Sequence, residues 1–251
     1  MADRLPRSGN PGLNDKTFAS APLVYTGERM TLQGAINKSF LLLVVLLAAA
    51  LYPWSQFLSG DASVVGISML GGLLGGFVLG LIISFKPAAA PYLSIPYAAC
   101  EGLALGAISA VLERRFPGIA IQAVALTFCV LGSMLALYSF RIIRATERLR
   151  AIVFTGMLAL MIFYGVTMLL QAFFHVDTSA VMGSTPLSIG ISLLAIGLAA
   201  MKLILDFDLI ESGAARGVPR YMEWYSAFGL LVTLVWLYTE ILRLLANSRR
   251  S

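Results

Sequence analysis

The sequence predicts an all-α membrane protein built as a bundle of seven transmembrane helices. Of its 251 residues, 59% are hydrophobic and only 12% are charged, whereas a soluble domain usually carries about 25% charged residues. The apolar residues come in runs of about twenty, the length at which a helix crosses a hydrocarbon core of about 30 Å. The lipid bilayer is therefore expected to surround most of the chain.

A polar tail precedes the first apolar run. Residues 1–38 show no sustained apolar period, so we expect a largely disordered tail, with a short interfacial helix near Met30–Lys38 as an option. A signal peptide would begin its apolar region earlier, so the first run is expected to stay as a span. Residues 39–251 then form the transmembrane domain. Its expected spans are 39–58, 64–85, 92–112, 119–140, 151–174, 186–208 and 221–244.

Loop residues separate these runs in order. The breaks lie at Gly60-Asp61, Lys86-Pro87, Arg114-Arg115 with Pro117-Gly118, Arg141–Arg150, His175–Pro186 and Gly213–Pro219. Basic residues are concentrated in the tail and in every second loop, which favours a cytoplasmic N-terminus. Seven crossings then place the C-terminus outside. The alternative, in which the last apolar run re-enters instead of crossing, sharpens the charge bias and stays open.

Glycines in the second span predict close packing of helices. The stretch at 66–85, GISMLGGLLGGFVLGLIISF, has glycines four residues apart, among them Gly72 and Gly76. One face is therefore nearly free of side chains, so a neighbouring helix can approach closely. Gly102 and Gly106 extend the pattern to the third span. A flexible gating helix is the alternative interpretation.

The residue types do not favour an enzyme. The single histidine, His175, lies at the end of a span, and Cys100 and Cys129 do not have the spacing of metal ligands. No phosphate-binding loop is present in the sequence. The net charge is +5, and the basic residues that cause it lie between apolar runs. There they are expected to orient the chain in the bilayer rather than to bind nucleic acid. We expect no enzymatic activity and no cofactor.

Carboxylates at membrane depth are the candidate functional residues. An ionisable group there costs about 2.5–3.5 kcal/mol even on lenient scales, so it usually faces a cavity or a partner. Glu101 lies near the middle of the third span, and either serves an ion pathway or hydrogen-bonds to a neighbouring helix. Asp206 and Asp208 close the sixth span, and Lys202 precedes Asp206 by four residues on one helical face. We expect a function for Asp206, whereas Asp208 is expected to be solvated.

The turn after the sixth span brings a third acid into this region. Glu223, in the opening turn of the seventh span, is expected at about the depth of Asp206 and Asp208. Ca²⁺ prefers several oxygen ligands, so these three residues are candidate Ca²⁺ contacts or a proton-sensitive cluster. The alternative is that all three are in contact with water.

The seventh span carries a line of polar residues. Ser226, Thr233 and Glu240 recur every seven residues, which a helix surrounded by lipid does not need. We therefore expect this helix at the centre of the bundle. Arg243 follows Glu240 by three residues, so an interfacial ion pair is the alternative role for Glu240.

Several long blocks point to a family. They are EGLALGAIS at 101–109, LYSFRIIRATERLR at 137–150, LDFDLIESG at 205–213, and the stretch from VPRYMEWY at 218 to the end of the last span. In these blocks and in their order the sequence resembles the Bax inhibitor-1 family of membrane proteins, and specifically its bacterial branch. The resemblance covers nearly the whole chain.

The resemblance implies a seven-helix fold with a central last helix and a pH-sensitive leak of Ca²⁺ or other cations. In the family, aspartates on the sixth and seventh helices hold the pore closed until their protonation changes. The first corresponds to Asp206, but the second falls at Thr233, which cannot ionise. Thr233 is then expected to donate a hydrogen bond to Asp206, or Glu223 or Glu240 replaces the acid. Lys86 corresponds loosely to a family arginine after the second helix.

Two functions follow from the resemblance. The first is a cation-leak channel of the bacterial cytoplasmic membrane. Its candidate pathway residues are Asp206, Glu101, Glu223, Thr233, Glu240 and Lys86. The alternative is a non-conducting protein that modulates membrane proteases or stress responses through membrane-protein partners. Its contact surfaces would be the tail and the loop at 141–150.

Overall fold

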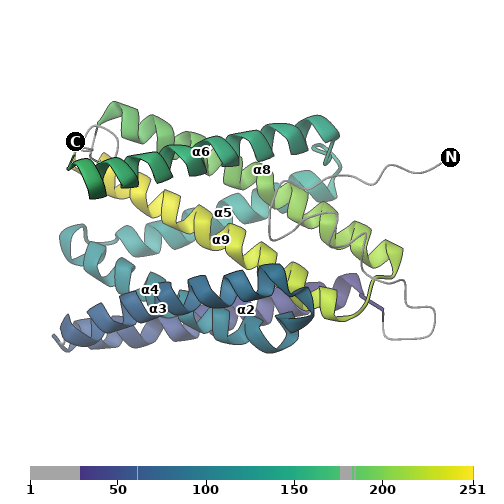
Figure 1. Cartoon of the computed structure of the whole chain (residues 1–251), viewed down its shortest axis with the longest axis horizontal. Helices are drawn as coiled ribbons and strands as arrows, with labels where there is room; N and C mark the ends of the chain where they lie inside the picture. Colours follow the sequence, from purple (N-terminus) through teal and green to yellow (C-terminus); the bar gives the residue numbers. More distant parts are fainter. Residues whose placement is uncertain (1–28, 61, 176–182, 184, 251) are drawn as a thin grey trace.

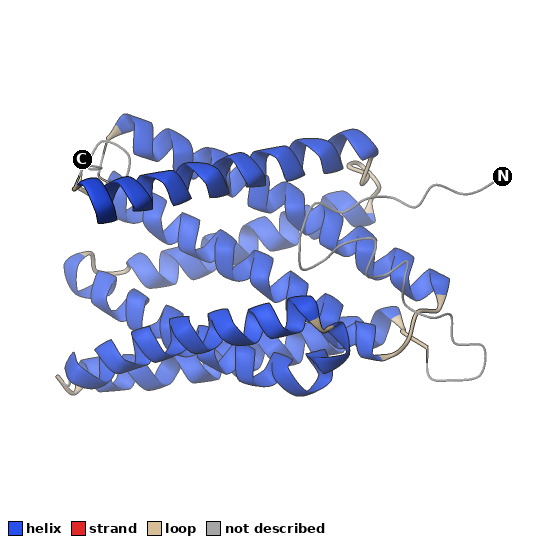
Figure 2. Cartoon of the chain, in the orientation of Figure 1, coloured by secondary structure: helices blue, strands red, loops and turns tan. Residues whose placement is uncertain are grey.

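The computed structural model describes residues 29–60, 62–175, 183 and 185–250 (Figure 1). Helices joined by loops make up these residues, and Figure 2 shows no strand among them. The helices are α2 (Leu32–Leu58), α3 (Ala62–Phe85), the 3-10 turn η1 (Pro87–Ala89), α4 (Ala90–Arg115), α5 (Ile119–Ser139), α6 (Glu147–Phe174), α8 (Pro186–Arg216) and α9 (Tyr221–Ser248). Seven of them are long and apolar enough to cross a membrane. The predicted all-α membrane fold is confirmed.

Two helix ends differ most from the expected spans, by seven and eight residues. α2 begins at Leu32 rather than at residue 39, because the Thr31 hydroxyl caps it by accepting a hydrogen bond from the Gly34 amide at 2.9 Å. α8 continues past residue 208 to Arg216 and ends at Gly217, whose φ of 67° suits glycine. Residues 32–38 of the expected tail are therefore helical. Residues 1–28 lie outside the described part of the chain.

α9 lies at the centre of the bundle, as the polar line along it predicted. It packs against α2, α4, α5 and α8, and in Figure 1 it runs diagonally between the α2–α4 layer and the pair α6 and α8. Half of the residues in its most apolar stretch are buried, compared with 17% in α6. α6 packs mainly on α8 at the edge of the bundle. α9 is therefore the helix that joins the two sides of the bundle.

The glycine pattern brings α2, α3 and α4 together. A side chain at Gly72 on α3 would collide with the backbone of α4 near Cys100. A side chain at Gly102 or Gly106 on α4 would collide with carbonyl groups of α2. The absence of Cβ atoms thus allows the close approach that the sequence predicted.

The starts of α2 and α9 lie at the same end of the bundle. The Met30 amide donates a hydrogen bond to the Val218 carbonyl at 2.7 Å, and Arg29 forms an isolated β-bridge with Pro219. α9 continues without a break for 28 residues, or about 42 Å. This length exceeds the hydrocarbon core and favours a crossing helix over a re-entrant one.

Candidate functional site

A buried polar cluster joins α8 to α9 near the middle of both helices. Asp206 receives a hydrogen bond from Lys202 on one carboxylate oxygen and from the Thr233 hydroxyl, at 2.6 Å, on the other. All three residues are at most 3% exposed. We call Lys202, Asp206 and Thr233 the Asp206 cluster. It brings an acid, a base and a hydroxyl together where water and lipid are both excluded.

Helix geometry explains why these residues meet. Lys202 and Asp206 are four residues apart, so both lie on one face of α8. Asp206 lies ten residues before the end of α8, and Thr233 lies twelve residues after the start of α9. Both separations correspond to about 15–18 Å along the helix axis, so the turn between the helices places the two residues at one depth. The hydrogen bond that the sequence allowed between Thr233 and Asp206 is present.

Glu223 does not join the aspartates, in contrast to the expectation. Its carboxylate instead pairs with Lys38 and accepts hydrogen bonds from the Thr31 amide at 2.8 Å and hydroxyl at 2.9 Å. The expectation was wrong because α8 continues for two turns beyond residue 208. Glu223, in the first turn of α9, is ten residues before Thr233 and therefore lies about 15 Å along the helix axis from Asp206. Its partners come from the start of α2.

Asp208 is also paired rather than simply solvated. Its carboxylate lies 2.5 Å from the Arg150 guanidinium, and its side chain is 28% exposed. Asp206, Asp208 and Glu223 thus each have a different cationic partner. Within the described residues, no group of three acidic, histidine or cysteine side chains is placed to hold a metal ion. The three acids therefore do not lie together as one group, and Ca²⁺ binding by any of them stays a prediction.

The remaining candidates lie apart from the Asp206 cluster. Glu240 is 3% exposed and pairs with Arg243 at 3.5 Å, the ion pair that the sequence left open. Glu101 on α4 is half-buried, and a side chain at Gly76 on α3 would collide with its carboxylate. Lys86 is exposed at the end of α3. The structure brings Asp206 and Thr233 together but leaves these three residues at separate sites.

A polar-ended cavity lies beside the Asp206 cluster. This loop cavity, about 1050 Å³, is lined by residues of α2, α5, α8, α9 and the loop that follows α5. Asp208 and Glu211 line it together with Arg141 and Arg144 of that loop. Phe207 and Leu230 also line it, whereas Asp206 does not. An apolar layer of side chains therefore separates the cavity from the buried acid.

The sequence did not predict the ion pairs that connect distant segments. Lys38 and Glu223 are 185 residues apart, and Arg150 and Asp208 are 58 apart. The only sign of these pairs in the sequence was the position of the four residues. Each lies near an expected span end, where a charged side chain can meet one from another helix. Tyr138, whose hydroxyl donates to Glu211, carried no such signal.

Comparisons with known proteins identify the family. A family model described as Bax inhibitor 1 like matches residues 10–250. A search of curated proteins gives no match to this chain, and neither does a search of solved structures.

Proposed function

We propose, because this chain belongs to the Bax inhibitor 1 like family, that it forms a regulated leak pathway for Ca²⁺ or other cations. The observation that carries the proposal is the Asp206 cluster, a charged pair buried on the central helix contact of a membrane protein. Ionisable residues at that depth usually mark ion or proton pathways. The protein is proposed to lie in the bacterial cytoplasmic membrane with the start of α2 on the cytoplasmic side.

The Asp206 cluster is proposed to hold the pathway closed. Lys202 neutralises Asp206 from its own helix, and Thr233 ties the same carboxylate to α9. Protonation of Asp206 would remove the charge that holds Lys202 and would weaken the charge-assisted hydrogen bond from Thr233. The contact between α8 and α9 would then loosen.

The loop cavity supplies one approach to this cluster. Its apolar wall includes Phe207, the neighbour of Asp206 in the chain, and Leu230 of α9. Movement of α8 against α9 would shift this wall. Closure in this proposal therefore depends on Lys202 and Thr233, where the family resemblance implies a second aspartate.

Reconstitution into vesicles loaded with a Ca²⁺-sensitive dye tests the proposal. Because protonation opens the cluster, the flux is expected to rise as the external pH falls from about 8 to about 5. Empty vesicles prepared in parallel give the background leak. Absence of protein-dependent Ca²⁺ flux across this pH range would refute the proposed leak of Ca²⁺.

A second candidate function is favoured by the pairing of the acids. Asp206, Asp208 and Glu223 each have a basic partner, as expected of structural ion pairs in a protein that does not conduct. The exposed residues Arg144 and Arg148 then offer a contact surface to membrane-protein partners. Deletion of residues 1–28 tests this alternative. Loss of cross-linked partners without any change in Ca²⁺ flux would support it.

A further inference from the structure

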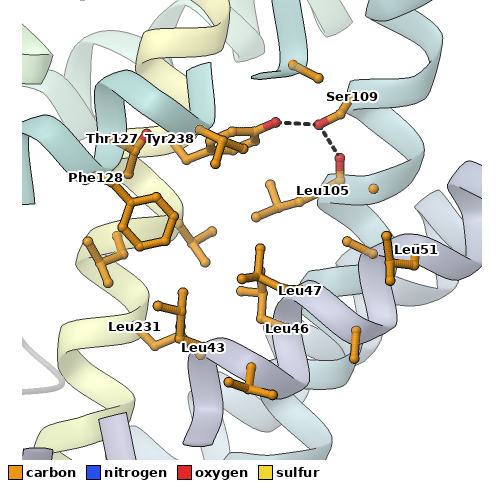
Figure 3. Close-up of a pocket in the computed structure, with 18 of the residues that line it drawn as sticks. Leu43, Leu46, Leu47, Leu51, Leu105, Ser109, Thr127, Phe128, Leu231 and Tyr238 are labelled. Carbon is orange, nitrogen blue, oxygen red and sulfur yellow. Dashed lines mark hydrogen bonds between the residues drawn. The ribbon is translucent and has the colours of Figure 1, made fainter. Parts of the chain in front are cut away.

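A second cavity, called here the apolar cavity, opens between α2 and α5. It measures about 540 Å³, and leucines of α2 together with residues of α4, α5 and α9 surround it (Figure 3). α2 and α5 both pack against α9 but make little contact with each other in the described chain. Leu47 and Phe128, which line the cavity, are about 40% exposed. The cavity is therefore open sideways, toward the lipid.

The few hydroxyl groups in the apolar cavity are already bonded within the protein. Ser109 donates to the Leu105 carbonyl at 2.6 Å and hydrogen-bonds to the Tyr238 hydroxyl, as Figure 3 shows. Thr127 donates to the Ala123 carbonyl at 2.7 Å. A cavity without free polar partners does not hold water or a cation well. A hydrocarbon chain is therefore the kind of ligand that suits the apolar cavity.

The apolar cavity and the loop cavity adjoin each other along α9. Leu43, Leu131 and Leu234 line both of them, one residue from each of α2, α5 and α9. Together the cavities extend along α2 from Leu32 to Trp54, which is about 33 Å of helix and close to the thickness of a hydrocarbon core. We call these two adjoining cavities together the lateral groove.

The lateral groove has one charged end. Arg141 and Arg144 line that end, both are exposed, and neither forms an ion pair with another described residue. The two acids at the same end are already bonded, Asp208 to Arg150 and Glu211 to the Tyr138 hydroxyl. Arg150 neutralises Asp208, whereas Glu211 keeps its negative charge because its hydroxyl partner is neutral; the two arginines therefore leave this end with a net positive charge. It lies at the end of the bundle, and the groove becomes fully apolar toward the middle.

We infer that the lateral groove binds one anionic glycerophospholipid. Its phosphate would lie against Arg141 and Arg144, whose guanidinium groups suit phosphate oxygens. One acyl chain would pass Leu43, Leu131 and Leu234 into the apolar cavity. The polarity of the groove follows that of a lipid from headgroup to chain end, and the opening between α2 and α5 lets a lipid enter from the bilayer. This inference does not depend on cation transport.

Native mass spectrometry of the detergent-purified protein tests this inference. The protein is titrated with phosphatidylglycerol and, separately, with the zwitterionic phosphatidylcholine. One phosphatidylglycerol is expected to bind about 25-fold more tightly, because each of the two arginines near the headgroup contributes about a factor of five. Equal binding of the two lipids by the unaltered protein, or a second copy of the chain in place of lipid, would overturn the inference.

Two variants locate the site, and each has a matched control. The double variant Arg141→Gln with Arg144→Gln is expected to lose the preference for phosphatidylglycerol. Its control, Arg114→Gln with Arg115→Gln, removes two exposed arginines outside the groove and should keep it. If both double variants behave alike, the arginine assignment is overturned.

A second pair of variants tests the apolar part of the groove. Ala48→Phe fills the apolar cavity from α2 and is expected to weaken the binding of both lipids severalfold. Ala159→Phe adds the same side chain at an exposed position of α6 and should have no effect. Circular dichroism confirms that each variant is folded. Unchanged lipid binding in folded Ala48→Phe would contradict a chain in this cavity.

Discussion

Individual residues matter most at the contact between α8 and α9. Asp206 and Lys202 are both 2% exposed and pair one helical turn apart. Removing both charges from water is costly, and their attraction offsets that cost only while both are present. The i,i+4 spacing made this pair predictable from the sequence. The ion pairs of Glu223 and Asp208 were not predictable, since they depend on which helix ends meet in space.

The first prediction tests the balance within this pair. Asp206→Ala leaves Lys202 buried without a counter-charge and is expected to cost about 3–5 kcal/mol in free energy of unfolding. The double variant Lys202→Met with Asp206→Leu removes both charges and should cost far less. Unfolding by denaturant in detergent measures both. If the two variants lose the same stability, the ion pair does not act as a unit.

For the helices, the sequence predicted their existence and their order well. It predicted the start of α2 and the end of α8 poorly. Apolar runs located all seven spans, because the bilayer demands long apolar helices. The Thr31 cap and the last turns of α8 are less apolar than the spans, so hydropathy carries little signal there. The misplaced end of α8 is the reason why Glu223 was expected beside the aspartates.

The second prediction concerns the contact between α2 and α4. Gly106→Ala places a methyl group against the backbone of α2 at Ala50 and is expected to cost about 1–3 kcal/mol in stability. Gly132→Ala, on α5, has open space within 4 Å and serves as the control. Thermal unfolding of the purified variants measures the difference. Equal melting temperatures would contradict the close contact between α2 and α4.

The third prediction concerns the attachment of α2 to the start of α9. Glu223→Ala removes the acceptor for Thr31 and the partner of Lys38. Hydrogen exchange in residues 30–38 is then expected to become faster, because the start of α2 loses its anchor. Glu147→Ala, in the exposed first turn of α6, is the control. Unchanged exchange in Glu223→Ala would show that the anchor is not needed.

For the whole molecule, the central position of α9 determines both proposed activities. The polar line on α9 predicted this position, and the packing of α2, α4, α5 and α8 around the helix agrees. The Asp206 cluster lies where α9 meets α8, and the lateral groove follows α9 between α2 and α5. The groove was not predictable from the sequence, because it arises from two helices that fail to meet.

The pH profile of Ca²⁺ flux in Asp206→Asn tests the central claim most directly. Asparagine cannot change its charge, so flux in reconstituted vesicles is expected to be raised and to lose its dependence on pH between about 5 and 8. Asp208→Asn, two residues away and outside the cluster, should keep the profile of the unaltered protein. If Asp206→Asn instead shows the same rise in flux with acid as the unaltered protein, Asp206 does not control the pathway.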